Sequence, residues 1–316
     1  MKLVITDCRT VTEGDIDLHV FDKFGDVTYY PLTTKAEVAA RIADADVVLC
    51  NKTPMDAGTL GHAAHLRYIG LFATGYNNVD LAYTNAHGIT VCNAGGYSTD
   101  AVAQHVFALL LAHTCRVAEY RAFVDAGGWK TADRFSPFVY PTAELSGKTM
   151  GLFGFGTIGR AVARIASAFG MRVIAATRTP RPMDGVTLVS FDELLAQADV
   201  ISVHCPLTPQ TMRLFNADAF ARCKAGAYFI NTSRGGVVDE PALRDAVLSG
   251  HLSGAAVDVL DSEPMAADCP LFGVPNLTIT PHVAWAPLEA RRRLVTIVEE
   301  NLQAFLDGKP QNVVNQ

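Results

Sequence analysis

The feature that most constrains this fold is a glycine-rich turn that lies between an apolar run and an amphipathic segment. Residues 148–153 predict a short strand, and Gly154, Gly156 and Gly159 follow with the spacing Gly-x-Gly-x-x-Gly. In such a turn the first glycine permits a sharp bend, the second lets a ligand approach the backbone, and the third lets helix and strand pack closely. Unpaired N–H groups at the start of the helix favour a phosphate, so the turn predicts a dinucleotide site.

The sequence on either side of the turn supports this interpretation. A chain with 25 glycines contains chance matches to the spacing, so the context has to decide. Apolar residues at helical spacing follow the turn, at Ile158, Val162, Ile165 and Phe169. Gly170 ends this helix, and residues 171–176 form a second apolar run. Together these segments predict a βαβ unit with parallel strands.

Length and charge limit the class of protein. At 316 residues the chain is long enough for two domains of ~150 residues each. Its 26 basic and 32 acidic residues give a net charge of −6, and its longest basic run is Arg291–Arg293. This balance argues against nucleic acid or a membrane surface as a partner.

The cysteines and the chain start point to a reducing compartment. The seven cysteines are scattered and include no Cys-x-x-Cys pair, so we expect neither disulfides nor a metal site. The N-terminus reads as a strand rather than as a signal peptide. The longest uncharged apolar run, at residues 106–112, is far shorter than the ~20 residues that span a bilayer. We therefore expect a cytoplasmic protein.

Two series of alternating strands and helices organise the chain. The first series has β-rich runs at residues 3–6, 27–30, 47–50, 68–72 and 90–92, and a helical stretch at 35–43. The second follows the glycine turn, with runs at 200–205, 227–231, 254–259 and 277–280 and a helical stretch at 240–248. An amphipathic helix begins after Pro287. Repeated βα units predict two doubly wound α/β units, each with a parallel sheet covered on both faces.

The segment between the two series predicts a buried helix and an interface. Residues 98–126 read as one helix, which is apolar nearly all round in its first half. His105 and His113 lie on it, and we interpret both as satisfied core or interface residues rather than ligands. A proline-punctuated loop follows, with the aromatic residues Phe135, Phe138 and Tyr140. Exposed aromatic residues on a loop favour a homodimer contact, with a substrate contact as the alternative.

Three polar residues follow strands of the second series: Arg234, Glu263 and His282. The guanidinium of Arg234 can clamp a carboxylate and stabilise a developing oxyanion. Reduction of a 2-oxo acid by hydride transfer builds negative charge on the carbonyl oxygen, which a protonated His282 can neutralise as general acid. A carboxylate at Glu263 favours the protonated imidazole. Backbone N–H groups where a first-series strand ends, at Ala73, Thr74 and Gly75, can take the substrate carboxylate.

These blocks resemble a known family. Residues 154–159, 231–236, 258–264 and 281–282 look, in order and spacing, like the signature blocks of the D-isomer-specific 2-hydroxyacid dehydrogenases. The resemblance covers essentially the whole chain and is greatest to the glycerate dehydrogenase, or hydroxypyruvate and glyoxylate reductase, branch. It implies that Arg234, Glu263 and His282 are catalytic and that the substrate is a small 2-oxo or 2-hydroxy acid.

The resemblance also implies further contacts and a domain division. The implied cofactor contacts, besides the glycine turn, are Thr157, Ile158, Cys205, Pro206, Thr211, Thr232, Ser233 and Asp258, and the implied substrate contacts include Lys52 and Trp285. The family has a flavodoxin-like substrate domain, here residues 1–98 plus 287–316. A Rossmann NAD(P)-binding domain, here residues 99–286, is inserted into it, with the active site in the cleft between them.

One departure from the family pattern bears on the cofactor. NAD-preferring members end the second strand of the βαβ unit with an acidic residue that binds the ribose 2′-hydroxyl, whereas this chain has Thr177 and Arg178, followed by Arg181. Loss of the carboxylate removes a repulsion against a 2′-phosphate, and arginines can pair with it. We therefore expect NADP(H) to be favoured over NAD(H).

Two other functions are compatible with this pattern. One is a phosphite or formate dehydrogenase on the same scaffold, although the long N-terminal extension common among formate-type members is absent. The other is a cofactor-sensing scaffold of the corepressor type, which keeps the fold and the three polar residues. Turnover of a 2-oxo acid separates the enzyme from the scaffold.

Overall fold

A computed structural model describes residues 1–315, and the chain divides into two compact units. Unit 1 consists of Met1–Ser98 together with the C-terminal segment that begins at Ala286, and unit 2 consists of Thr99–Trp285. Each unit contains one parallel sheet, which confirms the predicted fold class of two doubly wound α/β units.

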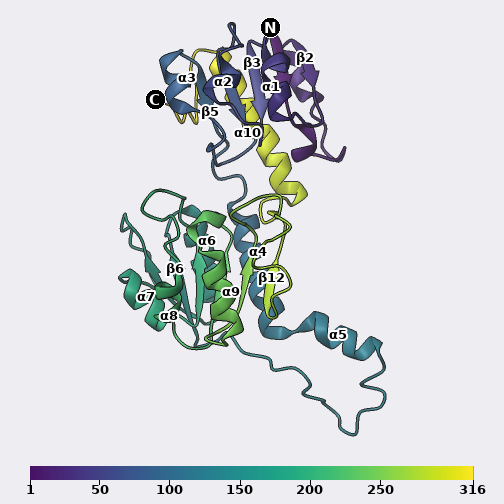
Figure 1. Cartoon of the computed structure of the whole chain (residues 1–316), viewed down its shortest axis with the longest axis vertical. Coiled ribbons are helices and arrows are strands. Elements are labelled where there is room, and N and C mark those ends of the chain that lie inside the picture. Colours follow the sequence, from purple (N-terminus) through teal and green to yellow (C-terminus); the bar gives the residue numbers. More distant parts are fainter. Residues whose placement is uncertain (316) are drawn as a thin grey trace. The chain divides into compact units, whose positions relative to one another are not determined.

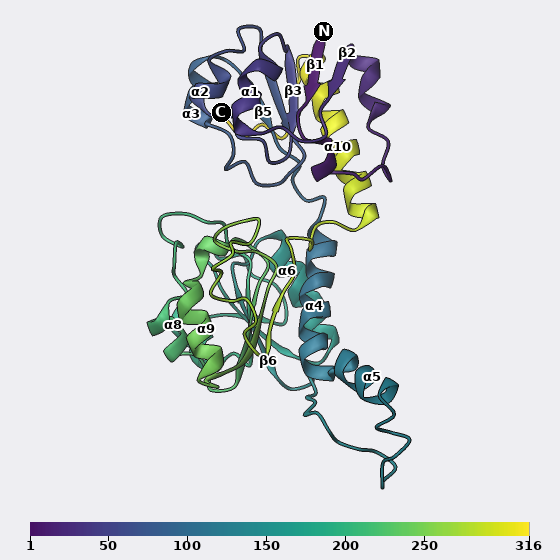
Figure 2. The same cartoon turned by 45° about the vertical axis from the view of Figure 1, so that its right-hand side comes forward.

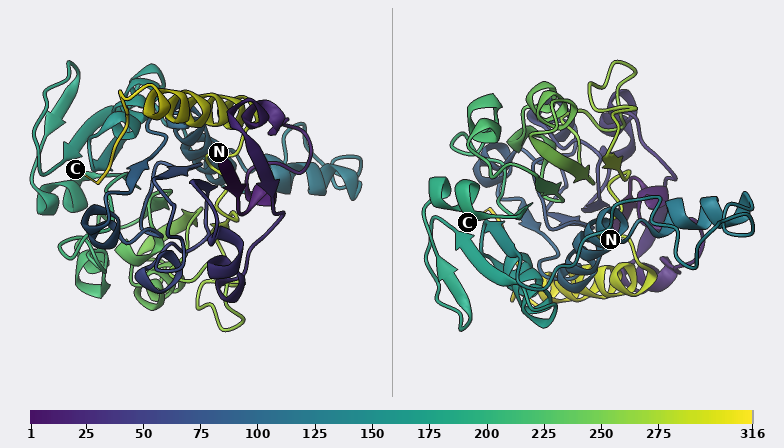
Figure 3. Two further views of the ribbon diagram at one scale, coloured as in Figure 1. Left: turned by 90° about the horizontal axis from the view of Figure 1, so that it is seen from above. Right: turned by 90° about the horizontal axis from the view of Figure 1, so that it is seen from below.

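Unit 1 is built on a five-stranded parallel sheet of order β2-β1-β3-β4-β5. Its strands are β1 (Lys2–Ile5), β2 (Asp26–Tyr29), β3 (Val47–Cys50), β4 (Tyr68–Leu71) and β5 (Thr90–Cys92). Its helices are α1 (Lys35–Ile42), α2 (Ala57–Leu60), α3 (Leu81–Ala86) and α10 (Leu288–Leu306), with 3-10 turns η1 (Cys8–Thr10) and η2 (His19–Phe24). Every residue of β3 and β4 is buried, because helices cover both faces, and Figure 3 shows α10 in yellow beside the sheet.

Unit 2 is built on a seven-stranded parallel sheet of order β12-β11-β10-β9-β6-β7-β8. Its strands are β6 (Thr149–Phe153), β7 (Arg172–Ala176), β8 (Val186–Leu188), β9 (Val200–Val203), β10 (Ala227–Asn231), β11 (Leu252–Val257) and β12 (Leu277–Ile279). Its helices are α4 (Thr99–Cys115), α5 (Val117–Asp125), α6 (Thr157–Ala168), α7 (Phe191–Gln197), α8 (Ala217–Ala221) and α9 (Glu240–Leu248), with a 3-10 turn η3 (Gly235–Val237). The short strand β8 is one that periodicity did not predict.

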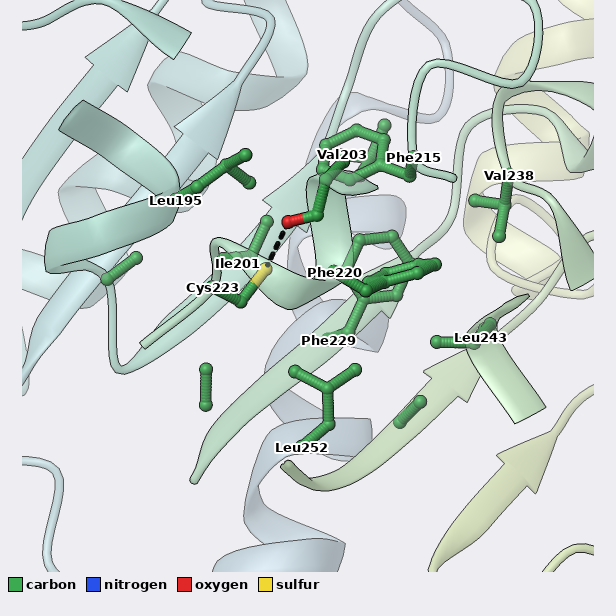
Figure 4. Packing of buried hydrophobic residues seen from close by; sticks show 14 of the residues in the cluster. Leu195, Ile201, Val203, Phe215, Phe220, Cys223, Phe229, Val238, Leu243 and Leu252 are labelled. Atoms are coloured by element: carbon green, nitrogen blue, oxygen red, sulfur yellow. Dashed lines mark hydrogen bonds between the residues drawn. The ribbon is translucent and has the colours of Figure 1, made fainter. Parts of the chain in front are cut away.

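Aromatic side chains fill one side of the core of unit 2. Phe215 packs edge-on against Phe153, with the ring centroids 5.4 Å apart, and also contacts Phe220 and Phe229. Figure 4 shows the rings of Phe215, Phe220 and Phe229 near Cys223, whose thiol donates to the carbonyl of Ala219. Burial raises the pKa of that thiol to about 12, so Cys223 behaves as a small apolar residue of the core, as expected for a reduced cysteine.

The segment predicted as one helix over residues 98–126 is two helices, and that prediction is wrong. Arg116, between α4 and α5, has φ 52° and ψ 35°, the left-handed conformation that ends a helix. Its guanidinium donates to Glu119 at 3.1 Å and to Asn276 at 3.3 Å, which fixes the break. The chain bends by 50° here, and Figure 1 shows α5 leading away from α4.

The two helices also differ in burial. Eight of the 17 residues of α4 are buried, from Ala101 to Thr114, whereas α5 has no buried residue. Among residues 1–315 no single helix is long and apolar enough to cross a membrane, and α4 and α5 reach that length and composition only when they are counted together across their bend.

Candidate active site

The carboxyl edge of the sheet in unit 2 gathers most of the residues singled out from the sequence. All seven strands are parallel, so their carboxyl ends meet at one edge, where open α/β sheets bind ligands. The residues that follow successive strands there are Gly154, Thr177, Cys205, Thr232, Asp258 and His282.

The glycine turn between β6 and α6 has the geometry that its spacing predicts. Gly154 has φ +94°, and a Cβ there would lie 2.6 Å from the carbonyl oxygen of His204. A Cβ on Gly159 would lie 2.4 Å from the carbonyl oxygen of Gly154. Gly156, the N-cap of α6, has no atom within 4 Å of its ideal Cβ position. The first and third glycines are therefore required by packing, whereas packing within the chain leaves room for a side chain at the second.

The structure around the turn fits a dinucleotide. The Thr232 hydroxyl is buried and has no hydrogen-bond partner within residues 1–315, which is costly unless a bound group supplies one. Thr157 and Ile158 open helix α6, directly after Gly156, and the N–H groups of a helix's first turn have no partner within the helix. These residues would hold the pyrophosphate and the groups next to it.

Residues after β9 form a compact turn at the same edge. The Thr211 hydroxyl donates to the carbonyl of Pro206 at 2.7 Å and accepts from the N–H of Thr208 at 2.8 Å. Burial raises the pKa of Cys205 to about 11, so this cysteine is a neutral thiol. The predicted cofactor contacts of Cys205, Pro206 and Thr211 remain predictions.

Residues after β7 carry positive charge at the end of the second strand of the βαβ unit. Thr177 is half-buried, and Arg178 and Arg181 are exposed. Arg160, on α6, donates to the carbonyl of Arg181 at 3.0 Å and thereby ties this loop to the helix that follows the glycine turn. No acidic residue occupies positions 177–183.

The loop after β10 holds Arg234 in an extended backbone conformation. The Asn231 side chain accepts from the N–H of Ser233 at 3.0 Å and donates to the carbonyl of Arg234 at 2.9 Å. A Cβ on Gly235 would lie 1.9 Å from the carbonyl carbon of Leu260. The loop that carries Arg234 therefore packs, backbone against backbone, on the segment that leads to Glu263.

Glu263 and His282 form a direct pair. The imidazole Nδ1 of His282 lies 2.6 Å from Oε2 of Glu263, and Oε1 of Glu263 accepts from the N–H of Leu260 at 2.9 Å. The side chain of Glu263 is 35% exposed and that of His282 is 26% exposed, so a ligand can still reach the pair. Because Nδ1 is engaged, Nε2 is the ring nitrogen that can pass a proton to a ligand. The catalytic roles of Arg234, Glu263 and His282 remain predictions.

Asp258 has a structural role that sequence reasoning missed. Its buried carboxylate accepts from the Thr280 hydroxyl at 2.5 Å and from the N–H groups of Val283 and Ala284, each at 2.9 Å. These three residues flank His282, so Asp258 anchors the loop that carries it. The signal in the sequence is an aspartate at the end of an apolar strand, to which the family resemblance assigns only a cofactor contact.

Both histidines of α4 contact neighbouring residues of unit 2, His105 through a hydrogen bond and His113 through ring stacking. His105 Nε2 lies 3.0 Å from the Thr280 hydroxyl and 3.5 Å from Asp258, so it supports the same loop. His113 stacks on Tyr228 with the ring centroids 4.0 Å apart. Burial, with a smaller effect of Arg116, lowers the pKa of His113 to about 4, so it is neutral. Within the described residues, no group of three or more His, Cys, Asp or Glu is arranged to hold a metal ion.

The predicted substrate contacts of unit 1 lie at the carboxyl edge of its own sheet. Lys52 follows β3, and Ala73, Thr74 and Gly75 follow β4. The Thr74 hydroxyl donates to the carbonyl of Ala94 at 3.0 Å, which ties this loop to the one after β5. Trp285, at the end of unit 2, follows the loop of His282. Their contacts with substrate remain predictions.

Comparison with known proteins adds an independent line of evidence. Residues 107–284 match the family model described as the D-isomer specific 2-hydroxyacid dehydrogenase, NAD binding domain. The chain is 41% identical over 322 aligned positions to the hydroxypyruvate reductase of Blautia hydrogenotrophica, with 100% of both chains covered.

Solved structures with the same fold include two with close overall similarity. A protein from Thermus thermophilus is 38% identical, with a TM-score of 0.90 and coverage of 99% of this chain and 100% of that one. An NADPH-dependent glyoxylate/hydroxypyruvate reductase from Sinorhizobium meliloti is 28% identical, with a TM-score of 0.85 and coverage of 99% and 97%.

Proposed function

Since the chain belongs to the D-isomer specific 2-hydroxyacid dehydrogenase family and is an NAD(P)-binding oxidoreductase of that family, we propose that it reduces hydroxypyruvate and glyoxylate to D-2-hydroxy acids. The observation that carries this proposal is the 2.6 Å pair of His282 and Glu263, which lies at the same sheet edge as the glycine turn. The full-length similarity to a hydroxypyruvate reductase supports the choice of substrate.

Each polar residue has a distinct task in this reaction. The chemistry that a reduced nicotinamide would supply here, when bound, is a hydride for the carbonyl carbon. His282 donates a proton from Nε2 to the carbonyl oxygen as negative charge develops there. Glu263 holds the imidazole through Nδ1 and so fixes the orientation of the ring, which leaves Nε2 to face the substrate. Arg234 pairs with the substrate carboxylate and the developing oxyanion through its planar guanidinium. In the oxidative direction neutral His282 accepts the proton from the hydroxyl group.

The cofactor proposed is NADP(H) in preference to NAD(H). Thr177 stands where a carboxylate would repel a 2′-phosphate, and the exposed guanidinium groups of Arg178 and Arg181 lie on the same loop. The Sinorhizobium meliloti reductase, which shares the fold, is NADPH-dependent.

We also propose roles for the two units and a homodimer. Unit 2, with the glycine turn, is the nucleotide-binding domain, and unit 1, with Lys52 and the loop of Ala73–Gly75, is the substrate domain. The exposed aromatic residues after α5 form the contact between two copies of the chain.

The test is a steady-state assay that follows oxidation of NADPH or NADH with hydroxypyruvate, glyoxylate, pyruvate and 3-phosphohydroxypyruvate in turn. We expect turnover of the first two acids, and a loss of kcat of ~100-fold or more in His282→Ala, since general acid catalysis is worth that much. His105 contacts the loop of His282, so it is not an independent control. The exposed His62, in unit 1, serves instead as His62→Ala. Absence of turnover with all four acids would favour the sensing scaffold.

A further inference from the structure

A buried carboxylate in unit 1 organises the loop that follows β3. Asp7 lies just after β1 and is 3% exposed. Its carboxylate accepts from three consecutive backbone N–H groups, those of Asn51 at 2.9 Å, Lys52 at 2.6 Å and Thr53 at 2.9 Å, and also from the Thr53 hydroxyl at 3.0 Å. Four donors thus converge on one side chain from a neighbouring strand end.

Consecutive N–H groups that point to one place form a concave anion site, of the kind that many proteins use for phosphates and carboxylates. Oδ2 of Asp7 accepts from the N–H groups of Lys52 and Thr53 and from the Thr53 hydroxyl, and Oδ1 accepts from the N–H of Asn51, so both oxygens are engaged by residues 51–53. Charge-assisted bonds of this type are about twice as strong as neutral ones. The anion site of this loop is therefore filled by the protein itself.

The loop is also tied to the next strand end. The Asn78 side chain donates to the carbonyl of Thr53 at 2.9 Å, and the N–H of Met55 donates to the carbonyl of Asn78 at 2.7 Å. Asn78 belongs to the segment after β4 that begins with the loop of Ala73–Gly75. The exposed side chain of Lys52 thus extends from a backbone that is fixed on both sides.

We propose that Asp7 is a positioning residue for substrate binding. By filling the anion site of residues 51–53, it fixes the backbone of Lys52 so that the ammonium group, and not the backbone of this loop, joins Arg234 in binding the carboxylate of the 2-oxo acid. This inference rests on the proposed function, because it assigns a substrate contact to Lys52.

The first test compares Asp7→Asn with a matched control. In Asp7→Asn an amide NH₂ faces backbone N–H groups, so the loop loses its fixed geometry. We expect the KM for hydroxypyruvate to rise by about 10- to 100-fold, as the loss of a bond to a charged group suggests, while the Kd of NADPH, measured by fluorescence, stays within about twofold. The control is Asp46→Asn, since Asp46 accepts from the N–H of Lys2 at 2.7 Å at the other end of the same sheet.

The control separates positioning from stability. Asp46→Asn should lower the unfolding midpoint and leave the KM unchanged. An equal rise of the KM in both variants, or an unchanged KM in Asp7→Asn, would overturn the proposal. A lower KM in Asp7→Asn would also overturn it, because the carboxylate would then act only by repelling an anionic substrate.

A double-mutant cycle tests the route through Lys52. We expect Lys52→Met to raise the KM, and Asp7→Asn to add no further increase in that background, because both changes remove the same interaction. Independent, multiplicative effects would contradict the proposal. If Asp7→Asn does not fold, Thr53→Val replaces it. It leaves the three backbone donors in place and removes the hydroxyl bond to Asp7 at 3.0 Å, together with the bond from the Thr6 hydroxyl at 2.8 Å, and it should raise the KM by a smaller factor.

Two further experiments, rescue by formate and hydrogen exchange, test whether the carboxylate of Asp7 holds the backbone of residues 51–53. In Asp7→Ala, added formate should occupy the site of the three N–H groups and lower the KM, whereas the same formate should not lower the KM of the wild type. Failure of rescue counts against the proposal. Hydrogen exchange of the backbone amides of residues 51–53, measured by mass spectrometry, should be faster in Asp7→Asn than in the wild type. This measurement does not depend on turnover. If exchange is faster but the wild type reduces no 2-oxo acid, the proposed function is wrong and the role of Asp7 in holding the loop still stands.

Discussion

At single positions, two glycines of one turn lack a side chain for different reasons. Gly154 has a positive φ and packs against the backbone of His204, so a methyl group has no room there. Gly156 has φ −80° and ψ −157°, a conformation that any residue adopts, and no neighbour within 4 Å of its Cβ position. The fold requires the first glycine, whereas for the second we propose that only a bound dinucleotide requires the absence of a side chain.

This difference predicts that substitution by alanine affects stability at Gly154 and cofactor affinity at Gly156. Gly154→Ala should lower the free energy of unfolding by about 2 kcal/mol or more, from the positive φ and the clash. Gly156→Ala should change it by less than about 0.5 kcal/mol but raise the Kd of NADPH at least ~10-fold, because the methyl group occupies the approach to the backbone. Urea unfolding and cofactor titration measure the two quantities. Equal stability losses in both variants would contradict this account.

Cofactor preference is also decided at single positions. Thr177→Asp should place a carboxylate where NAD-preferring relatives have one, repel the 2′-phosphate and offer an acceptor to the ribose hydroxyl. We expect the ratio of kcat/KM for NADPH to that for NADH to fall by about 10-fold or more, since each tenfold corresponds to ~1.4 kcal/mol. Thr179→Asp, an exposed position two residues further on, is the matched control. An unchanged ratio in Thr177→Asp would refute the assignment.

At the scale of elements, the strand ends in both units are organised by buried aspartates. Asp7 after β1 holds the loop after β3, and Asp258 after β11 holds the loop after β12. In both cases the acceptor lies on one strand end and the backbone donors on a nearby one. A parallel sheet brings such ends together, and a carboxylate can satisfy several N–H groups there that have no ladder partner.

This arrangement predicts the effect of Asp258→Asn. The amide cannot accept from both Val283 and Ala284, so the unfolding free energy should fall by about 1–3 kcal/mol and kcat should fall because His282 loses its fixed position. Asp199→Asn is the control, since Asp199 accepts from the N–H of Thr149 at 2.8 Å at the amino end of the same sheet. It should reduce stability with little change in kcat, and an equal loss of kcat in both variants would count against a role in positioning.

Periodicity predicted the elements well where one repeat runs without interruption. The strands β3, β5 and β10 and the helix α9 have the predicted bounds, because their apolar residues recur at the spacing of a strand or a helix between clear turn signals. The break at Arg116 could not be read from the sequence, since arginine is a good helix former and its guanidinium bonds there to Asn276, far along the chain. The pairing of Glu263 and His282 was predictable from residue types, whereas the anchoring by Asp7 and Asp258 depends on which strands are neighbours.

At the scale of the whole molecule, the segment after α4 carries the two most exposed large apolar side chains of the described residues. Phe135 is 90% exposed and Phe138 is 87% exposed, on a segment where α5 has no buried residue. Figure 2 shows α5 and the following loop extending from α4, and Figure 3 shows α5 projecting in both views. Side chains this large and this exposed are typical of a surface that another chain covers, and a second copy of this chain brings the same apolar groups to it.

A double substitution tests this contact. We expect the wild type to sediment as a dimer with twice the chain mass of 33.9 kDa, and Phe135→Ser with Phe138→Ser to sediment as a monomer with an unchanged circular dichroism spectrum. Phe272→Ser is the control, because Phe272 is 70% exposed but lies in the loop between β11 and β12. The Phe272→Ser variant should remain a dimer, because it removes exposed apolar area outside the proposed contact. A monomeric wild type, or a dimer that both variants retain, would show that these aromatic residues serve another purpose.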